Sequence, residues 1–549
     1  MAQSFKTHDV TNQPPPLVGV NLLTSDPVLS ALLDPLPAQV SEQVGALGQF
    51  YGSAEAVELG RLANQWGPVL RTHDARGVRV DSVEYQAAYH ALVRRAVASG
   101  LHCSVWDASG PESRVRTLAR AARYFLAAQV DTGHLVPVSA TNAAVAALAH
   151  SPRLAEVWLP MIRSRKYDQT SRPAPQKGGV LLAVALGEKQ AGSDLGALTT
   201  RAERDGSEAR ADFRLVGHKW SVAGPAADAI VTLAQTRDGL SAFLAPRHLA
   251  DGTRNGIRLI RLKDKLGTRS VATGEIELES AVGWLLGASG RGLEVISEVV
   301  TLSRLDDALA AAALMRAALG EAVHHCRHRK VGGRLLIDQP LMARVLADFA
   351  LDVTAATALV FRVAEAFDRA GDDPAEAAFA RVMTPVAKYW IAKAAPAVIA
   401  EAMECVGGNA AVEESRLARL YRDIPMVALA DGPGNVLCLD VMRLLGKSNE
   451  PLEAVLSITE RALGGTAKSS LNILRAALAV ALADEGSARV LTEQLALTVA
   501  AATLHRSFPA EIGDAFVETR LGKGWRTTYG MLESRFDARG LLDFVCPAN

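Results

Sequence analysis

Closely spaced cysteines are absent from the chain. Its 549 residues contain five cysteines, and no two of them form a CxxC pair. Small secreted domains and structural zinc sites depend on cysteines at short, repeated spacings, so the sequence argues against both classes. Scattered thiols fit a reducing compartment, and we therefore expect a cytoplasmic protein.

Long apolar runs and a net charge are absent as well. The longest apolar runs, such as residues 476–483, fall far short of the roughly 20 residues that a membrane helix needs. The N-terminus lacks the charged start and apolar centre of a signal peptide, so the sequence predicts no membrane partner. Lys plus Arg and Asp plus Glu number 59 each, so any surface for nucleic acid must be local.

The pattern of apolar residues changes along the chain, which is too long for a single hydrophobic core. Over 27–165 and again over 291–447, Leu, Ala and Val recur at spacings of three and four, which predicts helices. Between them lie β-rich runs, in one of which Ile276 and Leu278 alternate with glutamates. The prediction is a mainly α fold with a small β domain, divided into a helical N-terminal domain (1–179), a β domain (180–290), a helical bundle (291–447) and a C-terminal helical extension (448–549).

Two motifs in the β region carry the chemistry. The run GEKQAGSD at 187–194 follows an apolar stretch, so a buried strand opens into a glycine-bearing loop whose free N–H groups can hold an anionic group. A tight turn produces the same kind of run, and the loop alone leaves both interpretations open. The second motif, VGHKWSVAG, follows at 216–224.

Together the motifs resemble those of the acyl-CoA dehydrogenase family, in which a TExxxGSD loop precedes a GxKxWIT-type strand by about 25 residues. The matching residues are Glu188, Gly192, Ser193, Asp194, Gly217 and Lys219. The segments THDVTNQPPPLVGVNLLTSD, YGSAEAVELGRLAN, RLKDKLGTRS and VGWLLG are similar to the enlarged AidB branch of that family, and the likeness runs from about residue 7 to about 447. The resemblance implies the acyl-CoA dehydrogenase fold with a β-barrel-like middle domain, FAD as cofactor, an acyl-CoA or similar thioester as substrate, and a homotetramer.

The resemblance also implies which residues contact FAD. In the loop, the strand and the region near 434 these are Leu186, Gly187, Glu188, Gly192, Ser193, Ser221, Val222, Ala223, Gly432, Gly434, Asn435 and Arg443. Arg329 corresponds to an arginine near the FAD pyrophosphate of a neighbouring subunit, and Gly407 and Gly408 to a turn beside the adenosine part. The GGxGY pattern of that turn is incomplete, because Ala410 and Ala411 replace its second glycine and its tyrosine.

Two hydroxyl groups that the family presents to the flavin are missing. Gly187 stands in place of a threonine, and Ala223 in place of a serine or threonine. Each lost hydrogen bond is worth roughly 0.5 to 1.5 kcal/mol, so we expect FAD affinity to fall about tenfold to a hundredfold.

The proposed base also departs from the family. A carboxylate there removes the α-proton of the thioester while the β-hydrogen leaves as hydride to the flavin. AidB-like sequences read WEGSGN where this chain reads ADGPGN, so Asp431 takes the position of the base and Ala430 that of the tryptophan. The shorter side chain withdraws the carboxylate by about 1.5 Å, which predicts poor turnover. A loop carboxylate that caps its neighbours explains Asp431 equally well.

Substrate contacts are implied at two positions. Ala430 leaves space beside the flavin, and Arg304 corresponds to an arginine that lines the acyl pocket. Arg304 and Arg443 are equally well explained as helix arginines in buried ion pairs. His324 and His328 stand four apart on a predicted helix, but no third ligand follows at a recognisable spacing, and we predict no metal site.

A role for double-stranded DNA is associated with the C-terminal region of the AidB branch. From 451 to 549 the chain carries ten Lys and Arg against eleven Asp and Glu, which is not a general phosphate-binding surface. The best local patch combines Arg520, Lys523 and Arg526 with aromatic residues, a pattern that also fits a subunit interface. Three functions remain: a weak FAD-dependent acyl-CoA oxidoreductase, a DNA-binding protective protein of the alkylation response, and a flavin-poor scaffold.

Overall fold

The computed structural model describes residues 7–205, 212–448, 450–463, 467–522 and 536–547. The helices of its N-terminal region are α1 (Pro27–Leu32), α2 (Ala38–Tyr51), α3 (Ala54–Gln65), α4 (Ala87–Ala98), α5 (Ser104–Asp107), α6 (Arg116–Ala128), α7 (Val136–Leu148) and α8 (Pro152–Ile162). Local side chains start several of them: Asp26 accepts a hydrogen bond from the first turn of α1, and Ser53 does so for α3. These caps satisfy N–H groups that have no partner within the helix.

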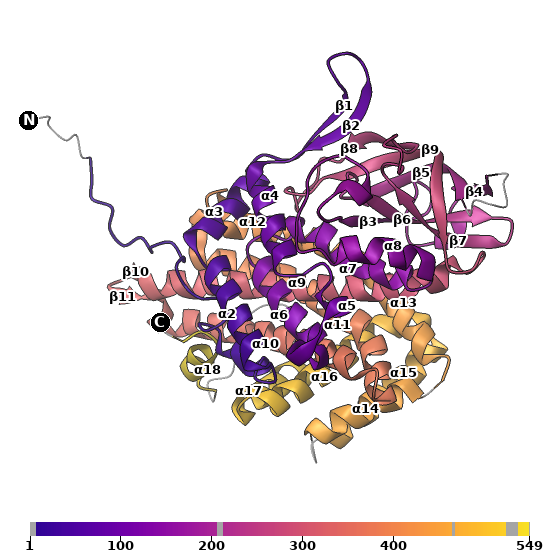
Figure 1. Ribbon diagram of the computed structural model, residues 1–549. Helices are drawn as coiled ribbons and strands as arrows, with labels where there is room; N and C mark the ends of the chain where they lie inside the picture. Colours follow the sequence, from indigo (N-terminus) through magenta and orange to yellow (C-terminus); the bar gives the residue numbers. More distant parts are fainter. Residues whose placement is uncertain (1–6, 206–211, 449, 464–466, 523–535, 548–549) are drawn as a thin grey trace, which may run out of the picture.

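A hairpin interrupts this helical region and stands out from the body beside β8 (Figure 1). It consists of β1 (Val69–His73) and β2 (Arg79–Glu84), paired antiparallel. Asp74 accepts hydrogen bonds from the N–H groups of Arg76 and Val78, and Gly77 has a φ of 81°. The helical pattern predicted across 27–165 is wrong here, because this Asp-to-Gly turn folds the chain back on itself.

The β region forms one closed sheet. Its strands are β3 (Leu182–Ala185), β4 (Arg201–Arg204), β5 (Asp212–Ala223), β6 (Ala229–Thr236), β7 (Gly239–Pro246), β8 (Ile257–Leu262) and β9 (Thr273–Leu286). The order is β3-β6-β4-β5-β9-β7, and β7 also pairs with β6, so β6, β4, β5, β9 and β7 close into a ring. Outside the ring, β3 pairs with β6 and β8 pairs with β9. In β9, Ile276 and Leu278 are buried while Glu277 and Glu279 are exposed, as the alternation predicts. Glu275 departs from the alternation, because it is buried in ion pairs with Arg261 and Lys263. The sheet is barrel-like, and its interior is filled by side chains.

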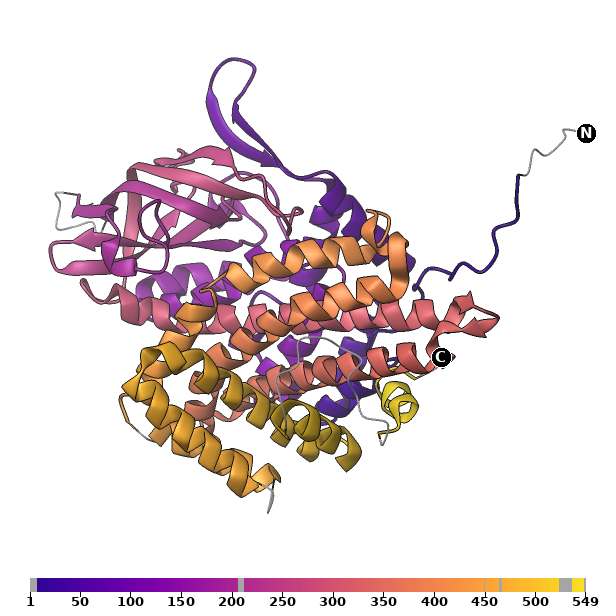
Figure 2. The same cartoon turned by 180° about the vertical axis from the view of Figure 1, so that it is seen from behind.

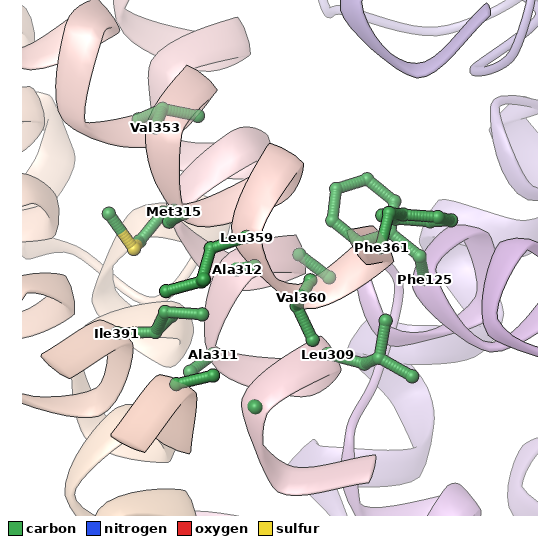
Figure 3. Close-up of a cluster of buried hydrophobic side chains, with 14 of the residues drawn as sticks. Phe125, Leu309, Ala311, Ala312, Met315, Val353, Leu359, Val360, Phe361 and Ile391 are labelled. Carbon is green, nitrogen blue, oxygen red and sulfur yellow. The ribbon is translucent and has the colours of Figure 1, made fainter. Parts of the chain in front are cut away.

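Long antiparallel helices form the centre of the molecule. They are α9 (Gly292–His328), α10 (Pro340–Arg369), α11 (Pro374–Val406), α12 (Arg416–Leu429) and α13 (Gly434–Leu445), with a short hairpin of β10 (Lys330–Val331) and β11 (Arg334–Leu335) after α9. Their core is rich in alanine: Ala311 and Ala312 of α9 lie among Leu359 and Val360 of α10 and Ile391 of α11 (Figure 3). Small side chains let the helix backbones approach closely, so the core is packed by many short contacts.

Further helices cover one face of this bundle, as the rear view shows (Figure 2). They are α14 (Glu450–Leu463), α15 (Ala467–Ala483), α16 (Ala488–Ser507), α17 (Ala510–Phe516) and α18 (Ala538–Val545). α16 packs against both α10 and α11, and its buried Leu495 and Val499 belong to the main core. The described part of the C-terminal extension is therefore packed on the bundle, as its amphipathic sequence predicts. The mainly α fold with a small β domain and a C-terminal helical extension, predicted above, is confirmed.

One described stretch, Arg416–Leu445, is long and apolar enough by composition to cross a membrane. The structure breaks it at residues 430–433 into α12 and α13, and both helices pack against α11. A stretch of this composition is also typical of a core helix, so it is weak evidence for a membrane span.

Candidate active site

The loop that follows β3 is built around a buried ion pair. Lys219 of β5 lies 3.0 Å from Glu188, and both side chains are 0% exposed. The Lys219 ammonium also donates to the carbonyls of Leu186 and Leu233, so all three of its N–H groups have acceptors. The two Glu188 carboxylate oxygens accept from the backbone N–H and hydroxyl groups of Thr199 and Thr200.

These contacts decide the charge of Glu188. Burial alone disfavours the carboxylate, but the hydrogen bonds from Thr200, Thr199 and Lys219 outweigh it and hold the pKa of Glu188 below its usual range. The carboxylate points inward, to its own protein partners. Glu188 can therefore serve a flavin only by shaping the loop, through its fixed charge and through the backbone hydrogen bonds that join it to Ala191.

The outer face of the same loop is open. Gly192 and Ser193 are exposed, and so is Ser221 of β5, whereas Leu186, Gly187 and Ala223 are half-buried and Val222 is fully buried. The Trp220 N–H donates to the Gly187 carbonyl at 2.9 Å, which holds the loop beside the strand. The two predicted motifs thus come together and present exposed backbone and hydroxyl groups along one edge.

One observation fits FAD at this edge, and a second concerns the missing threonine. A Cβ atom at Gly192 would meet nothing within 4 Å, so a ligand can reach the backbone there. At Gly187 a Cβ would lie 3.5 Å from the Ala191 carbonyl oxygen, an ordinary contact. The position therefore accepts a Cβ atom, and the missing threonine is a loss of a hydroxyl group that crowding at Cβ does not explain.

Asp431 sits on a strained loop between α12 and α13. Its φ is 46°, a left-handed conformation that aspartate tolerates better than most residues, and Gly432 follows with a φ of 113°. Asp431 is exposed. Its backbone carbonyl accepts a hydrogen bond from Nε of Arg304 at 2.9 Å. The loop therefore presents a carboxylate to solvent, while the hydrogen bond from Arg304 fixes its backbone.

The arginines near this loop are held in ion pairs. Arg304 is buried and donates to Asp440 at 2.6 Å, and Arg443 reaches the other oxygen of Asp440 at 3.0 Å. Arg443 remains 66% exposed, so it keeps donors free for a ligand. Asn435 accepts from Arg489 of α16 at 2.8 Å. The ion-pair explanation of Arg304 fits the geometry.

The residues expected near the FAD pyrophosphate and adenosine lie in other parts of the fold. Arg329 follows α9 and donates to the backbone oxygen of Asn12 at 2.6 Å, which ties the N-terminal segment to the end of that helix. Gly407 and Gly408 are exposed in a turn after α11, where added Cβ atoms would meet nothing within 4 Å.

Two functional candidates escaped the sequence-based predictions. Asp307 of α9 and Lys388 of α11 lie 2.7 Å apart directly below the Asp431 loop. The signal was available: a lysine inside the apolar run TPVAKYWIAK and paired aspartates in an alanine-rich helix are unusual, because isolated buried charges are costly.

With this geometry in view, comparisons with known proteins identify the chain. Residues 183–281 match the model of the acyl-CoA dehydrogenase middle domain and residues 290–446 that of the acyl-CoA dehydrogenase C-terminal domain. AidB of Escherichia coli (strain K12) is 44% identical over 447 residues, which cover 81% of each protein. The chain belongs to the acyl-CoA dehydrogenase family. FAD is the cofactor of that family, as the resemblance predicts.

Other matches place this acyl-CoA dehydrogenase homologue within its family. Residues 12–169 match the model described as the adaptive response protein AidB N-terminal domain. Acyl-CoA dehydrogenase family member 11 of Caenorhabditis elegans is 30% identical, over 81% of this chain and 74% of that protein. The structure of Caenorhabditis elegans ACDH-11 in complex with C11-CoA superposes with a TM-score of 0.82 at 26% identity, covering 99% of this chain and 94% of that one. The resemblance to AidB is confirmed.

The proposed DNA patch needs a correction. Arg520 is not available for phosphate, because it donates to Asp348 at 2.7 Å and to Asp352 at 2.9 Å and its side chain is 11% exposed. These two aspartates lie on α10, so Arg520 ties the C-terminal extension to the bundle. Lys523 and Arg526 lie outside the described residues.

Arg520→Ala should therefore destabilise the protein. Removing one member of a buried ion pair typically costs about 3 to 5 kcal/mol, because the carboxylates of Asp348 and Asp352 are left without their partner. Thermal unfolding of Arg520→Ala and of Arg539→Ala, whose pairs with Asp338 and Asp543 are about half exposed, provides the comparison. Equal melting temperatures in the two variants would contradict the anchoring role.

His324 and His328 have ordinary partners. Nε2 of His324 lies 2.8 Å from the Pro15 oxygen, and Nδ1 of His328 lies 2.8 Å from the His324 oxygen. Among the described residues, no three His, Cys, Asp or Glu side chains gather as a metal site would require.

Proposed function

We propose that the protein is an FAD-dependent oxidoreductase that oxidises acyl-CoA thioesters slowly, with Asp431 as the base. The observation that supports this most directly is the Asp431 carboxylate, which is exposed at the family's base position on a loop whose backbone is held by Arg304. A carboxylate used only as a loop cap would turn toward backbone N–H groups of its own loop, and among the described residues none of these groups donates to the Asp431 carboxylate.

The residues of this chain divide the work as follows. When bound, FAD supplies the hydride acceptor. The exposed edge formed by Gly192, Ser193 and Ser221 binds and orients it, and Asp431 accepts the α-proton on a carboxylate oxygen. Gly187 and Ala223 lack the hydroxyls that would strengthen the flavin contact, and Ala430 leaves room beside it. Weak flavin binding and slow turnover follow from these departures.

A spectroscopic titration tests this proposal. The purified protein is mixed with excess FAD, the bound fraction is measured from the visible band, and short and branched acyl-CoA thioesters are then added without oxygen. We expect a shifted flavin band with substoichiometric binding, and slow bleaching by at least one thioester. A protein that binds no flavin at saturating FAD would refute the proposal and favour the scaffold function.

Restored hydroxyls should strengthen the flavin site. Gly187→Thr combined with Ala223→Thr is expected to raise FAD affinity by about tenfold to a hundredfold, since each new hydrogen bond contributes about 0.5 to 1.5 kcal/mol. Equilibrium dialysis with FAD measures the change. Gly187→Ala with Ala223→Ser separates the two positions, because only the second substitution adds a hydroxyl. Affinity that is unchanged in the double threonine variant would place the flavin elsewhere.

The assembly and a second role are also part of the proposal. Arg329, Gly407 and Gly408 lie away from the Asp431 loop, which fits a homotetramer in which neighbouring copies complete each FAD site; light scattering tests the mass. The match to the AidB N-terminal domain favours a second candidate, a double-stranded DNA-binding role in the alkylation response. Its test is salt-sensitive duplex binding that falls when Lys523 and Arg526 become alanine while folding is unchanged.

A further inference from the structure

Two buried cations hold consecutive carbonyl groups of the Asp431 loop. The Lys388 ammonium of α11 donates to the Ala430 carbonyl, and the Arg304 guanidinium of α9 donates to that of Asp431. Each cation has one carboxylate partner: Asp307 lies 2.7 Å from Lys388, and Asp440 lies 2.6 Å from Arg304. The loop is thus fixed at two successive peptides from two different helices.

Lys388 is a fully buried lysine, and its position needs a structural explanation. Its side chain is 0% exposed, in a helix that is otherwise apolar at this depth, and an ammonium group taken out of water costs several kcal/mol unless its donors are used. Its ammonium donates a hydrogen bond to the Ala430 carbonyl and forms an ion pair with Asp307. A leucine or methionine would fill the same core without that cost. The charge of Lys388 is therefore explained by its contact with the Ala430 carbonyl.

Asp307 faces charged and titratable groups on every side. These are Lys388 of α11, Asp431 of the loop, Tyr124 of α6 and, on its own helix, Asp306, which is neutralised by a bidentate pair with Arg120. Burial raises the pKa of Asp307 to about 7; the Lys388 charge opposes this rise, and the Asp431 charge adds to it. Burial therefore makes the charged form of Asp307, the partner of Lys388, unfavourable.

We infer that the Asp307–Lys388 pair is a positioning device for the proposed base, which fixes the Ala430 carbonyl so that the short Asp431 side chain starts from a defined backbone. The inference rests on the proposed function for its catalytic meaning, but the positioning itself concerns the protein without flavin. Since a misplacement of about 1 Å can lower a rate on the order of a hundredfold, a carboxylate shortened by one methylene needs a rigid loop more than glutamate does.

Hydrogen exchange of the flavin-free protein tests the positioning. In Lys388→Met and in Asp307→Asn we expect amide exchange in residues 430–432 to become about tenfold faster, because the loop loses its tie to α11. Asp352→Asn is the matched control: it also removes a buried acidic partner, that of Arg520, and should leave exchange in this loop unchanged. Equal exchange in Lys388→Met and wild type would overturn the inference.

Stability as a function of pH gives a second readout without flavin. The pKa of Asp307 is raised to about 7 in the folded protein, whereas an unfolded aspartate has a pKa of 3.8, so between these values the folded state binds more protons. Stability contributed by this group is fully present below pH 3.8 and is lost as the pH rises through about 7. Asp307→Asn should flatten the fall in urea midpoint between pH 5 and 8, while Asp352→Asn should keep it. If the urea midpoint of Asp307→Asn falls with pH as steeply as that of wild type, Asp307 is not the group that titrates beside Lys388, and the inference loses its charged partner.

The flavin-loaded protein separates positioning from general stability. Lys388→Met with Asp307→Asn removes both charges and should regain stability relative to Lys388→Met alone, yet bleach with acyl-CoA on the order of a hundredfold more slowly than wild type. A double variant that is both stable and as fast as wild type would overturn the inference. If wild type never bleaches while the exchange result holds, the proposed function fails and the positioning stands.

Discussion

Asp431→Glu is expected to raise the rate at which acyl-CoA bleaches the bound flavin by about a hundredfold. The added methylene returns the carboxylate by about 1.5 Å toward the substrate, and a shift of about 1 Å is worth on the order of 10²-fold in rate. Stopped-flow absorbance of the flavin-loaded protein without oxygen measures the change. The same substitution should cost about 1 kcal/mol of stability, because φ of 46° at this position suits aspartate better than glutamate.

Two further variants define the origin of the gain. Asp431→Asn keeps the size and the left-handed backbone but cannot accept the proton, so bleaching should fall to the background of free flavin. Asp440→Glu lengthens another carboxylate of the same region, one that already pairs with Arg304, and should not accelerate the reaction. If Asp431→Asn bleaches as fast as wild type, Asp431 is a loop cap and the base lies elsewhere.

Much of the fold follows from the pattern of apolar residues. Alternation in residues 274–282 predicts a strand, and Ile276 and Leu278 do face the core of the sheet. Helical spacing over 291–447 predicts a bundle, and the alanine-rich helices pack there. The hairpin at 69–84 was missed because its strands are half-buried and polar, so that only the Asp74-to-Gly77 turn distinguishes it from helix.

The candidate site was less accessible from the sequence. Motif order locates the loop at 187–194 and the strand at 216–224, but it does not show that the Glu188 carboxylate is turned inward onto Lys219. Charge counting suggests that Arg520 is free, whereas its partners Asp348 and Asp352 lie about 170 residues earlier in the chain. Contacts between such distant segments depend on helix packing, which no local pattern encodes. Asp307 and Lys388 were missed for the same reason.

Lys219→Met is expected to have the largest effect on folding. Glu188 would remain fully buried without its countercharge, and the carbonyls of Leu186 and Leu233 would each lose a donor. Removing one member of a buried pair costs about 3 to 5 kcal/mol, and each orphaned carbonyl adds about 1 kcal/mol or more. We expect much less soluble protein and a lower unfolding midpoint, measured by urea denaturation.

The comparison with an exposed pair shows why burial decides this outcome. Arg475→Ala removes a partner of Glu453, but both side chains are about half exposed, so water replaces the lost contact and the unfolding midpoint should stay close to that of wild type. Lys219→Met with Glu188→Gln should recover part of the loss, because the amide carries no charge and still accepts from Thr199 and Thr200. If Lys219→Met unfolds at the same urea concentration as Arg475→Ala, the loop does not depend on this pair.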